Sequence, residues 1–128
     1  MMIKTLFMLI CSVTIFLQTI SAQEKTDLNG QWQFKTDPYA KGETEAWFSP
    51  ETASCSWDSM EVPGNWDLHN EYSEYAGDAW YSRVFDVPGT WENKEVRLVF
   101  QSVYNDCVIW LNGEKAGENH LGFLPFHT

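Results

Sequence analysis

The clearest pattern of hydrophobic positions lies between Val103 and Gly117. The apolar run Cys107 to Leu111 is rich in β-branched and aromatic side chains, and Asn112-Gly113 follows it directly. Asn and Gly tolerate positive φ, so the pattern predicts a β-strand that turns back as a hairpin. Because apolar side chains would face both sides of this strand, we expect it in the middle of a two-layer β structure.

Shorter segments with β-strand patterns precede this hairpin. Trp32 and Phe34 alternate with Gln33 and Lys35, which is typical of a half-buried strand. Turn signals follow each segment, and none of ten or more residues keeps a helical period. The predicted strands are residues 31–36, 57–62, 79–87 and 95–100. Their number and spacing predict an all-β sandwich.

Longer polar segments separate these strands. Residues 39–56 are expected to form a loop that wraps the sheets and is fixed by Trp47, and residues 65–77 a second loop. The last residues, 118–128, are expected to form a loop with Pro125 near its end.

The first 22 residues have the pattern of a targeting segment rather than of a structural element. Lys4 precedes an apolar run from Leu6 to Leu17, and a small residue, Ala22, ends the segment. This is the layout of a secretory signal peptide. We therefore expect residues 23–128 to form one exported domain, secreted or periplasmic. No later stretch is apolar enough to span a membrane.

Charge narrows the range of partners. The chain has 18 acidic and 8 basic residues, and its net charge is −10 with neutral histidines. Nucleic acid and anionic membranes would be repelled, so we expect neither as a partner. A neutral sugar is compatible with this charge, but the charge does not point to it.

Four stretches in a fixed order carry a resemblance to a known family. They are residues 28–34, residues 62–66, residues 77–88, and residues 103–117 followed by 120–126. Together they resemble the amino-terminal sugar-binding domain of the family two glycoside hydrolases, which include β-galactosidases, β-glucuronidases and β-mannosidases. The resemblance implies a galactose-binding-like jelly-roll β-sandwich. The family pattern continues past Pro125-Phe126 with further strands, so we expect a copy truncated at its C-terminal end, with exposed and aggregation-prone edges.

The carboxylates that a glycosidase needs are not recognisable. Retaining enzymes place two carboxyl groups about 5 Å apart. Asn70-Glu71 is similar to the dipeptide that carries the family's acid/base, but it lies in a predicted loop without alternating β and α segments, and we interpret it as solvated. Neither family catalytic glutamate is present. No motif calls for a cofactor, and no spacing of histidine, cysteine or acidic residues predicts a metal site.

Aromatic and polar residues on loops are the candidates for sugar contact, because an indole stacks on the C–H face of a pyranose while hydroxyls need polar partners. Trp66 and Tyr75 fit this description. The resemblance implies that loops of this domain border a pocket in a downstream catalytic barrel, and that Asp78 binds a substrate hydroxyl. The alternative for Asp78 is a turn-stabilising residue beside Gly77. His120 is a further candidate, with a loop hydrogen bond as the alternative because no partner is visible.

Other aromatic residues and the cysteines are expected to be structural. Trp32, Trp80 and Trp110 lie in predicted strands and are assigned to the interior. Cys55 and Cys107 are expected to be unpaired, although an exported protein permits a disulfide.

One position departs from the family pattern. Many members have a small or acidic residue where Leu121 precedes Gly122-Phe123, so we expect this loop to pack on a neighbouring domain.

These observations favour a sugar-binding and scaffold domain of a secreted retaining β-glycosidase, in contact with a downstream barrel and with a homo-oligomer of the parent left open. The alternatives are a stand-alone carbohydrate-binding module and a purely structural interaction domain.

Overall fold

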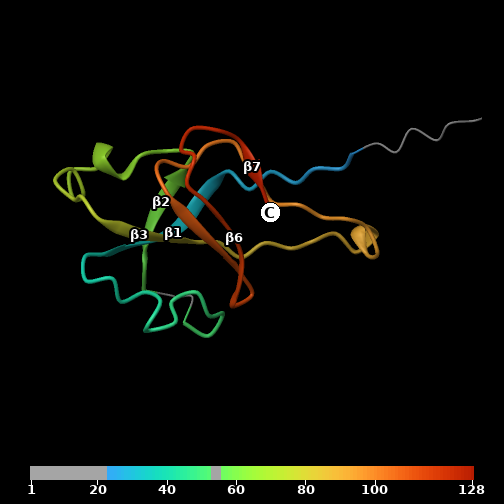
Figure 1. The fold of residues 1–128 in the computed structure, drawn as a ribbon, viewed down its shortest axis with the longest axis horizontal. Helices are drawn as coiled ribbons and strands as arrows, with labels where there is room; N and C mark the ends of the chain where they lie inside the picture. Colours follow the sequence, from blue (N-terminus) through green and yellow to red (C-terminus); the bar gives the residue numbers. More distant parts are fainter. Residues whose placement is uncertain (1–22, 53–55) are drawn as a thin grey trace, which may run out of the picture.

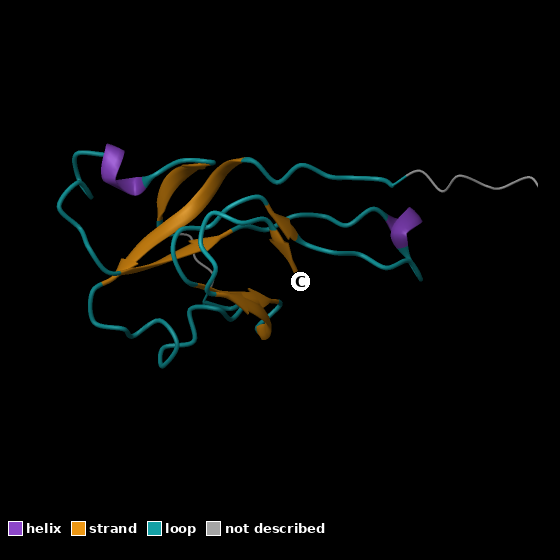
Figure 2. Ribbon diagram, turned by 45° about the horizontal axis from the view of Figure 1, so that its top comes forward, coloured by secondary structure: helices purple, strands orange, loops and turns teal. Residues whose placement is uncertain are grey.

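The computed structural model describes residues 23–52 and 56–128. The expected signal peptide and Cys55 lie outside the described residues. Figures 1 and 2 show strands and two short 3₁₀ turns joined by long loops. The strands are β1 (Gly30–Asp37), β2 (Asp58–Val62), β3 (Asp78–Ser82), β4 (Val99–Phe100), β5 (Cys107–Leu111), β6 (Glu114–Asn119) and β7 (Phe126–His127), and the 3₁₀ turns are η1 (Trp66–Leu68) and η2 (Gly89–Trp91). The all-β prediction is confirmed.

The strands of the described part form three antiparallel sheets, ordered β2-β1-β3, β4-β7 and β5-β6. The strand β1 is central to the largest sheet because it pairs along one edge with β2 and along the other with β3. Its alternating sequence predicted a half-buried strand, and that prediction is confirmed.

Phe34 is the centre of the small core. Its side chain is fully buried, and Met60 on β2 is the other buried hydrophobic residue in the described part of the chain. The ring of Phe34 contacts three aromatic rings, with centroid distances of 5.0 Å to Tyr72, 5.0 Å to Tyr81 and 5.8 Å to Trp66. The loop between β2 and β3 thus covers one face of the sheet.

The predicted hairpin is confirmed, but its predicted position is wrong. Asn112 and Gly113 have positive φ values of 51° and 88° and join β5 to β6. Among the described strands, β5 pairs only with β6, and Val108 is 41% exposed. An apolar pattern identifies side chains that avoid water, but it does not identify what covers them.

Strand ends also differ from the prediction. The strand predicted for residues 79–87 ends at Ser82, and Val84 beyond it is 90% exposed. The Arg83 side chain donates to the backbone carbonyls of Asn29 and Gln31, at 3.1 and 3.3 Å, beside the end of the β1–β3 ladder. The guanidinium group of Arg83 thus occupies backbone carbonyl groups to which a longer β3 would donate hydrogen bonds.

The C-terminal residues were wrongly predicted to form only a loop. The strand β6 extends to Asn119, and β7 pairs with β4. The backbone N–H and carbonyl groups of Leu98 and Thr128 exchange hydrogen bonds of 3.1 and 3.2 Å beside this pair. The strand predicted for residues 95–100 is correspondingly short, because β7 offers it only a short partner.

Candidate functional site

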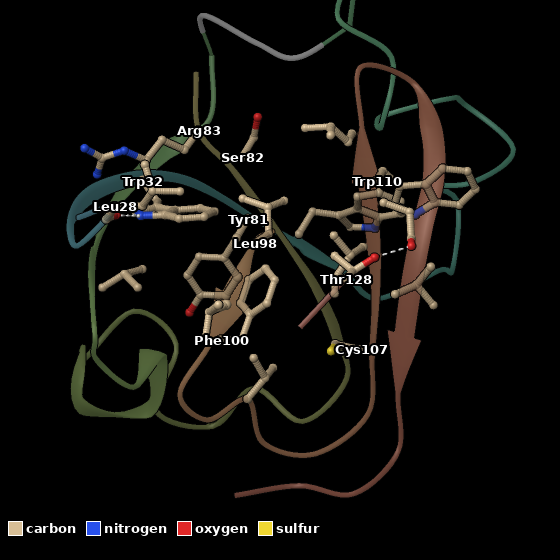
Figure 3. A pocket seen from close by; sticks show the side chains of 18 of the residues that line it. Leu28, Trp32, Tyr81, Ser82, Arg83, Leu98, Phe100, Cys107, Trp110 and Thr128 are labelled. Atoms are coloured by element: carbon tan, nitrogen blue, oxygen red, sulfur yellow. Dashed lines mark hydrogen bonds between the residues drawn. The ribbon is translucent and has the colours of Figure 1, made fainter. Parts of the chain in front are cut away.

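A wide open hollow lies between the three-stranded sheet and the β5–β6 hairpin. Figure 3 shows aromatic and aliphatic side chains facing it, from β1, β3, β4 and the hairpin. They include Trp32, Tyr81, Leu98, Phe100 and Trp110, and the Cys107 thiol. The hollow is therefore mainly apolar, and polar groups reach it from the loops.

Tyr75 and Asp78 form one compact feature at the start of β3. The Tyr75 hydroxyl donates to the backbone carbonyl of Asp78 at 2.6 Å. A Cβ on Gly77 would lie 2.7 Å from the Tyr75 oxygen, so only glycine fits between the two residues. Burial raises the pKa of the Tyr75 phenol. The hydrogen bond engages the backbone of Asp78, and the residue itself is exposed.

A neighbouring aspartate that the sequence analysis did not single out organises this end of the sheet. Asp37 pairs with Asp78 across the β1–β3 ladder and is 5% exposed. Its carboxylate accepts the backbone N–H groups of Lys41 and Gly42 at 2.7 and 2.8 Å, and the indole N–H of Trp80 at 3.1 Å. Burial acts to raise the pKa of Asp37, but these hydrogen bonds outweigh it and lower that pKa.

The only sequence signal for this role was Asp37-Pro38 at the end of a strand, which predicted where the strand stops. The same aspartate is a capping residue for the turn that follows, because aspartate readily accepts hydrogen bonds from nearby backbone N–H groups.

Trp66 lies in η1 and is half-buried. Its indole packs on Phe34 and also on Tyr81, at a ring-centroid distance of 6.4 Å. In the same loop the Tyr72 hydroxyl donates to the carboxylate of Asp58 on β2. This hydrogen bond, followed by burial, raises the pKa of Tyr72 to about 12. The loop that carries Trp66 and Tyr75 is thus attached to the sheet at several points.

His120 lies in a different part of the hollow, directly after β6. Its Nδ1 is 3.4 Å from Asp106 Oδ1 and its Nε2 is 3.8 Å from Glu118 Oε1. No partner of His120 was visible in the sequence, and the fold brings these two carboxylates to it. Because Cys107 faces Asn119 across the hairpin, the residue before β5 comes to lie beside the residue after β6.

The four candidates therefore fall into two groups that all line the hollow. Trp66 and Tyr75 lie in the loop between β2 and β3, and Asp78 is the first residue of β3. His120, in contrast, lies directly after the hairpin strand β6.

The tryptophans assigned to the interior, Trp32, Trp80 and Trp110, are each half-buried rather than fully enclosed. The long loop after β1 is fixed by Trp47, as predicted. Its indole packs on Trp57 and Trp80, with centroid distances of 5.8 and 6.1 Å.

In residues 23–52 and 56–128, no group of three metal-binding side chains comes together. No helix in these ranges is long and apolar enough to cross a membrane. Glu71 lies on an exposed loop, and Cys107 carries a free thiol whose pKa burial raises.

Comparison with known proteins identifies the family. The family model for glycosyl hydrolases family 2, sugar binding domain, matches residues 25–128. A β-glucuronidase of Paenibacillus borealis is 31% identical over 117 residues, which are 89% of this chain and 19% of the relative. A β-galactosidase of Priestia megaterium is 28% identical over 77% of this chain and 12% of the relative.

Solved structures agree with these matches. A β-glucuronidase of an uncultured Clostridium species superposes with a TM-score of 0.75 and 36% identity, over 89% of this chain and 20% of that one. A β-glucuronidase of Lactobacillus rhamnosus gives a TM-score of 0.71 and 37% identity, over 78% of this chain and 17% of that one.

The match is confined to one part of these longer enzymes. The chain spans about a fifth of the length of the glucuronidases that it matches, and the catalytic part is absent from it. On the family model and the structural matches together, this chain belongs to the glycosyl hydrolases of family 2, where it corresponds to their N-terminal sugar-binding domain.

Proposed function

We propose that this chain is the sugar-binding and scaffold domain of an exported retaining β-glycosidase that hydrolyses β-linked glycosides. The observation that carries the proposal is the match of residues 25–128 to the family's sugar-binding domain, in relatives of which it covers only 12% to 20%. Those relatives are named as β-glucuronidases and β-galactosidases, so both substrate classes are candidates for the parent enzyme.

The Tyr75–Asp78 segment is our candidate for the wall of the catalytic pocket. Tyr75 and Gly77 hold the backbone of Asp78, and Asp37 anchors the adjacent end of β1. A carboxylate carried by a backbone held in this way can accept a hydrogen bond from a sugar hydroxyl. In this proposal Asp78 binds substrate, and Tyr75 and Trp66 position the segment.

The rest of a longer polypeptide is the proposed partner of the apolar hollow. Its tryptophans are half-buried, and several other apolar residues of its lining, among them Val84, Val99 and Phe123, are exposed. Contiguous exposed apolar surface is typical of an interaction face. The domain would contact a downstream catalytic barrel through this region. Residues 1–22 are proposed to be a signal peptide that directs the protein to the periplasm or outside the cell.

The test is hydrolysis by the complete product of the gene. We expect it to cleave nitrophenyl β-glucuronide or β-galactoside with retention of configuration, observed by NMR of the first product. Residues 23–128 alone should release no nitrophenol. In the complete product, Asp78→Asn should lower kcat/KM by about tenfold or more, because one charge-assisted hydrogen bond to the substrate is weakened.

Glu74→Gln is the matched control, since it removes an exposed carboxylate from the same loop. It should leave kcat/KM unchanged. Cleavage by residues 23–128 alone, or a complete product that hydrolyses none of these glycosides, would contradict the proposal.

A further inference from the structure

The segment before β1 is exposed at its beginning and is attached to the domain through its second described residue. Residues 23–27 are all exposed. Figures 1 and 2 show this segment running out from the sheets beside the loop that joins β3 to β4. The Glu24 carboxylate accepts the indole N–H of Trp91 in η2, and it pairs with Lys94 Nζ at 3.8 Å. Gln23 therefore lies just beyond the point of attachment.

Gln23 also follows directly after the proposed cleavage point. Ala22 is the small residue that ends the segment with the layout of a signal peptide. Cleavage after Ala22 makes Gln23 the first residue and gives it a free α-amine. The α-amine and the side-chain amide carbon of a glutamine are separated by the number of bonds that closes a five-membered ring, whereas an asparagine would have to close a strained four-membered ring.

Ring closure at an amino-terminal glutamine is a balanced step without a second reactant. The α-amino nitrogen attacks Cδ of the side-chain amide, and the new N–Cδ bond forms. The Cδ–Nε2 bond breaks, and ammonia leaves with one proton from the amine. Nothing is oxidised or reduced, and no water is consumed. The product is the lactam pyroglutamate, which carries no charge at its amino end.

The position of Gln23 in the fold favours this step. The amine and the amide of the residue must turn toward each other, and chain ends that are exposed keep this freedom. Exposure also lets an enzyme that catalyses the cyclisation reach Gln23. Because the segment is attached through the side chain of Glu24, the lactam forms without breaking the contacts to Trp91 and Lys94.

We propose that Gln23 is a modification site, which cyclises to pyroglutamate once the leader has been removed, so that the exported protein has a blocked amino end. The inference rests on the signal peptide of the proposed function, and it is independent of the substrate. The expected consequence is that aminopeptidases, which need a free α-amine, do not shorten the exposed segment.

The test is the chemical structure of the amino end of the complete gene product, made with its own leader and isolated after export. Intact mass spectrometry directly after purification should give the mass of a chain that begins at Gln23, less one ammonia. Edman degradation should give no sequence. Pyroglutamyl peptidase should remove one residue, after which the sequence begins Glu24-Lys25-Thr26.

Gln23→Asn is the matched control, because it keeps an amide at this position and the small residue before the cut. It should have its full mass and a readable sequence, and an aminopeptidase should shorten it while the unaltered protein resists. Asn29-Gly30 and Asn112-Gly113 would also lose ammonia on forming a succinimide, so a peptide map must place the loss in the first peptide.

The outcomes separate this inference from the proposed function. A chain that begins at Gln23 with a free amine overturns the modification and leaves the signal peptide standing. A chain that begins at Met1 overturns both, and equal loss of ammonia in Gln23→Asn overturns the assignment to this residue. Gln23→Asn should leave kcat/KM on a nitrophenyl glycoside unchanged. A blocked amino end on a protein that hydrolyses no glycoside would therefore contradict the proposed function alone.

Discussion

Gly42 lies so close to the indole of Trp80 that a larger side chain does not fit. An added Cβ would be 2.1 Å from the Trp80 Nε1 atom, and the N–H of Gly42 also donates to Asp37. We expect Gly42→Ala to lower the free energy of unfolding by about 1–3 kcal/mol, because the indole or the loop must move. Urea unfolding followed by tryptophan fluorescence measures this change.

Gly89→Ala is the control for this substitution. A Cβ at Gly89 has nothing within 4 Å, so the free energy of unfolding should stay the same or rise slightly. Equal destabilisation by the two substitutions would show that the contact with Trp80 does not matter.

Asp37 makes the stability of this end of the sheet depend on pH. Its pKa in the folded chain lies below the ordinary value of 3.8, so the unfolded chain binds a proton more readily between the two values. The contribution of Asp37 is therefore complete above about pH 4, and it is lost as the pH falls through the folded pKa.

We expect Asp37→Asn to lower the free energy of unfolding at neutral pH by about 2 kcal/mol, since an amide cannot accept all three N–H donors. Below pH 4 the difference from the unaltered chain should shrink, which urea titrations at several pH values would measure. A difference that is independent of pH would contradict the assignment of this role to the ionised carboxylate.

The hydrogen bond from Tyr72 to Asp58 joins two elements, the loop between β2 and β3 and the strand β2. It holds the loop between β2 and β3 against β2, and it raises the pKa of Tyr72 to about 12. Because the folded pKa is above the ordinary value of 10.0, this stabilisation is complete below pH 10 and is lost as the pH rises through about 12.

We expect the ultraviolet absorbance of tyrosinate to show a titration near pH 12 that is absent in Tyr72→Phe. In Asp58→Asn that titration should move down toward the ordinary value, since the charged acceptor is gone. If the late titration persists in Tyr72→Phe, another tyrosine causes it.

The elements that sequence patterns predicted well are those whose signals are local. The alternation around Phe34 located β1, and Asn112-Gly113 located the hairpin turn, because each depends on residues within the element. The end of β3 depends on Arg83 binding carbonyls near β1, about fifty residues earlier. The pairing of β4 with β7 also needs a distant partner, and no periodicity within a two-residue strand could have shown it.

The same contrast between local and distant signals applies to the residues of the candidate site. Tyr75 was singled out as an aromatic residue on a predicted loop and Asp78 through the resemblance to the family, and the structure adds the hydrogen bond between them. Asp37 was missed because its importance comes from three donors that only the folded loop and β3 bring to it. Asp106 was missed as a partner of His120 because only the hairpin register brings the two residues together.

At the scale of the whole molecule, the described part of the chain buries few hydrophobic residues. Phe34 and Met60 are buried, while the apolar side chains around the hollow are half-buried or exposed. A domain of about 100 residues ordinarily has a contiguous core whose members each touch several others. The apolar surface facing the hollow is therefore available to another surface.

Because this apolar surface is open, we expect the separate domain to differ from the complete gene product in dye binding and self-association. Residues 23–128 alone should bind the dye anilinonaphthalene sulfonate and self-associate, because the apolar lining is open to water. The charge of the chain, −10, opposes association, so added salt should promote it by screening that repulsion. Sedimentation velocity at low and high salt measures both effects. The complete product should bind little dye, since the proposed contact with the catalytic part covers the lining, and equal dye binding by the two would argue against that contact.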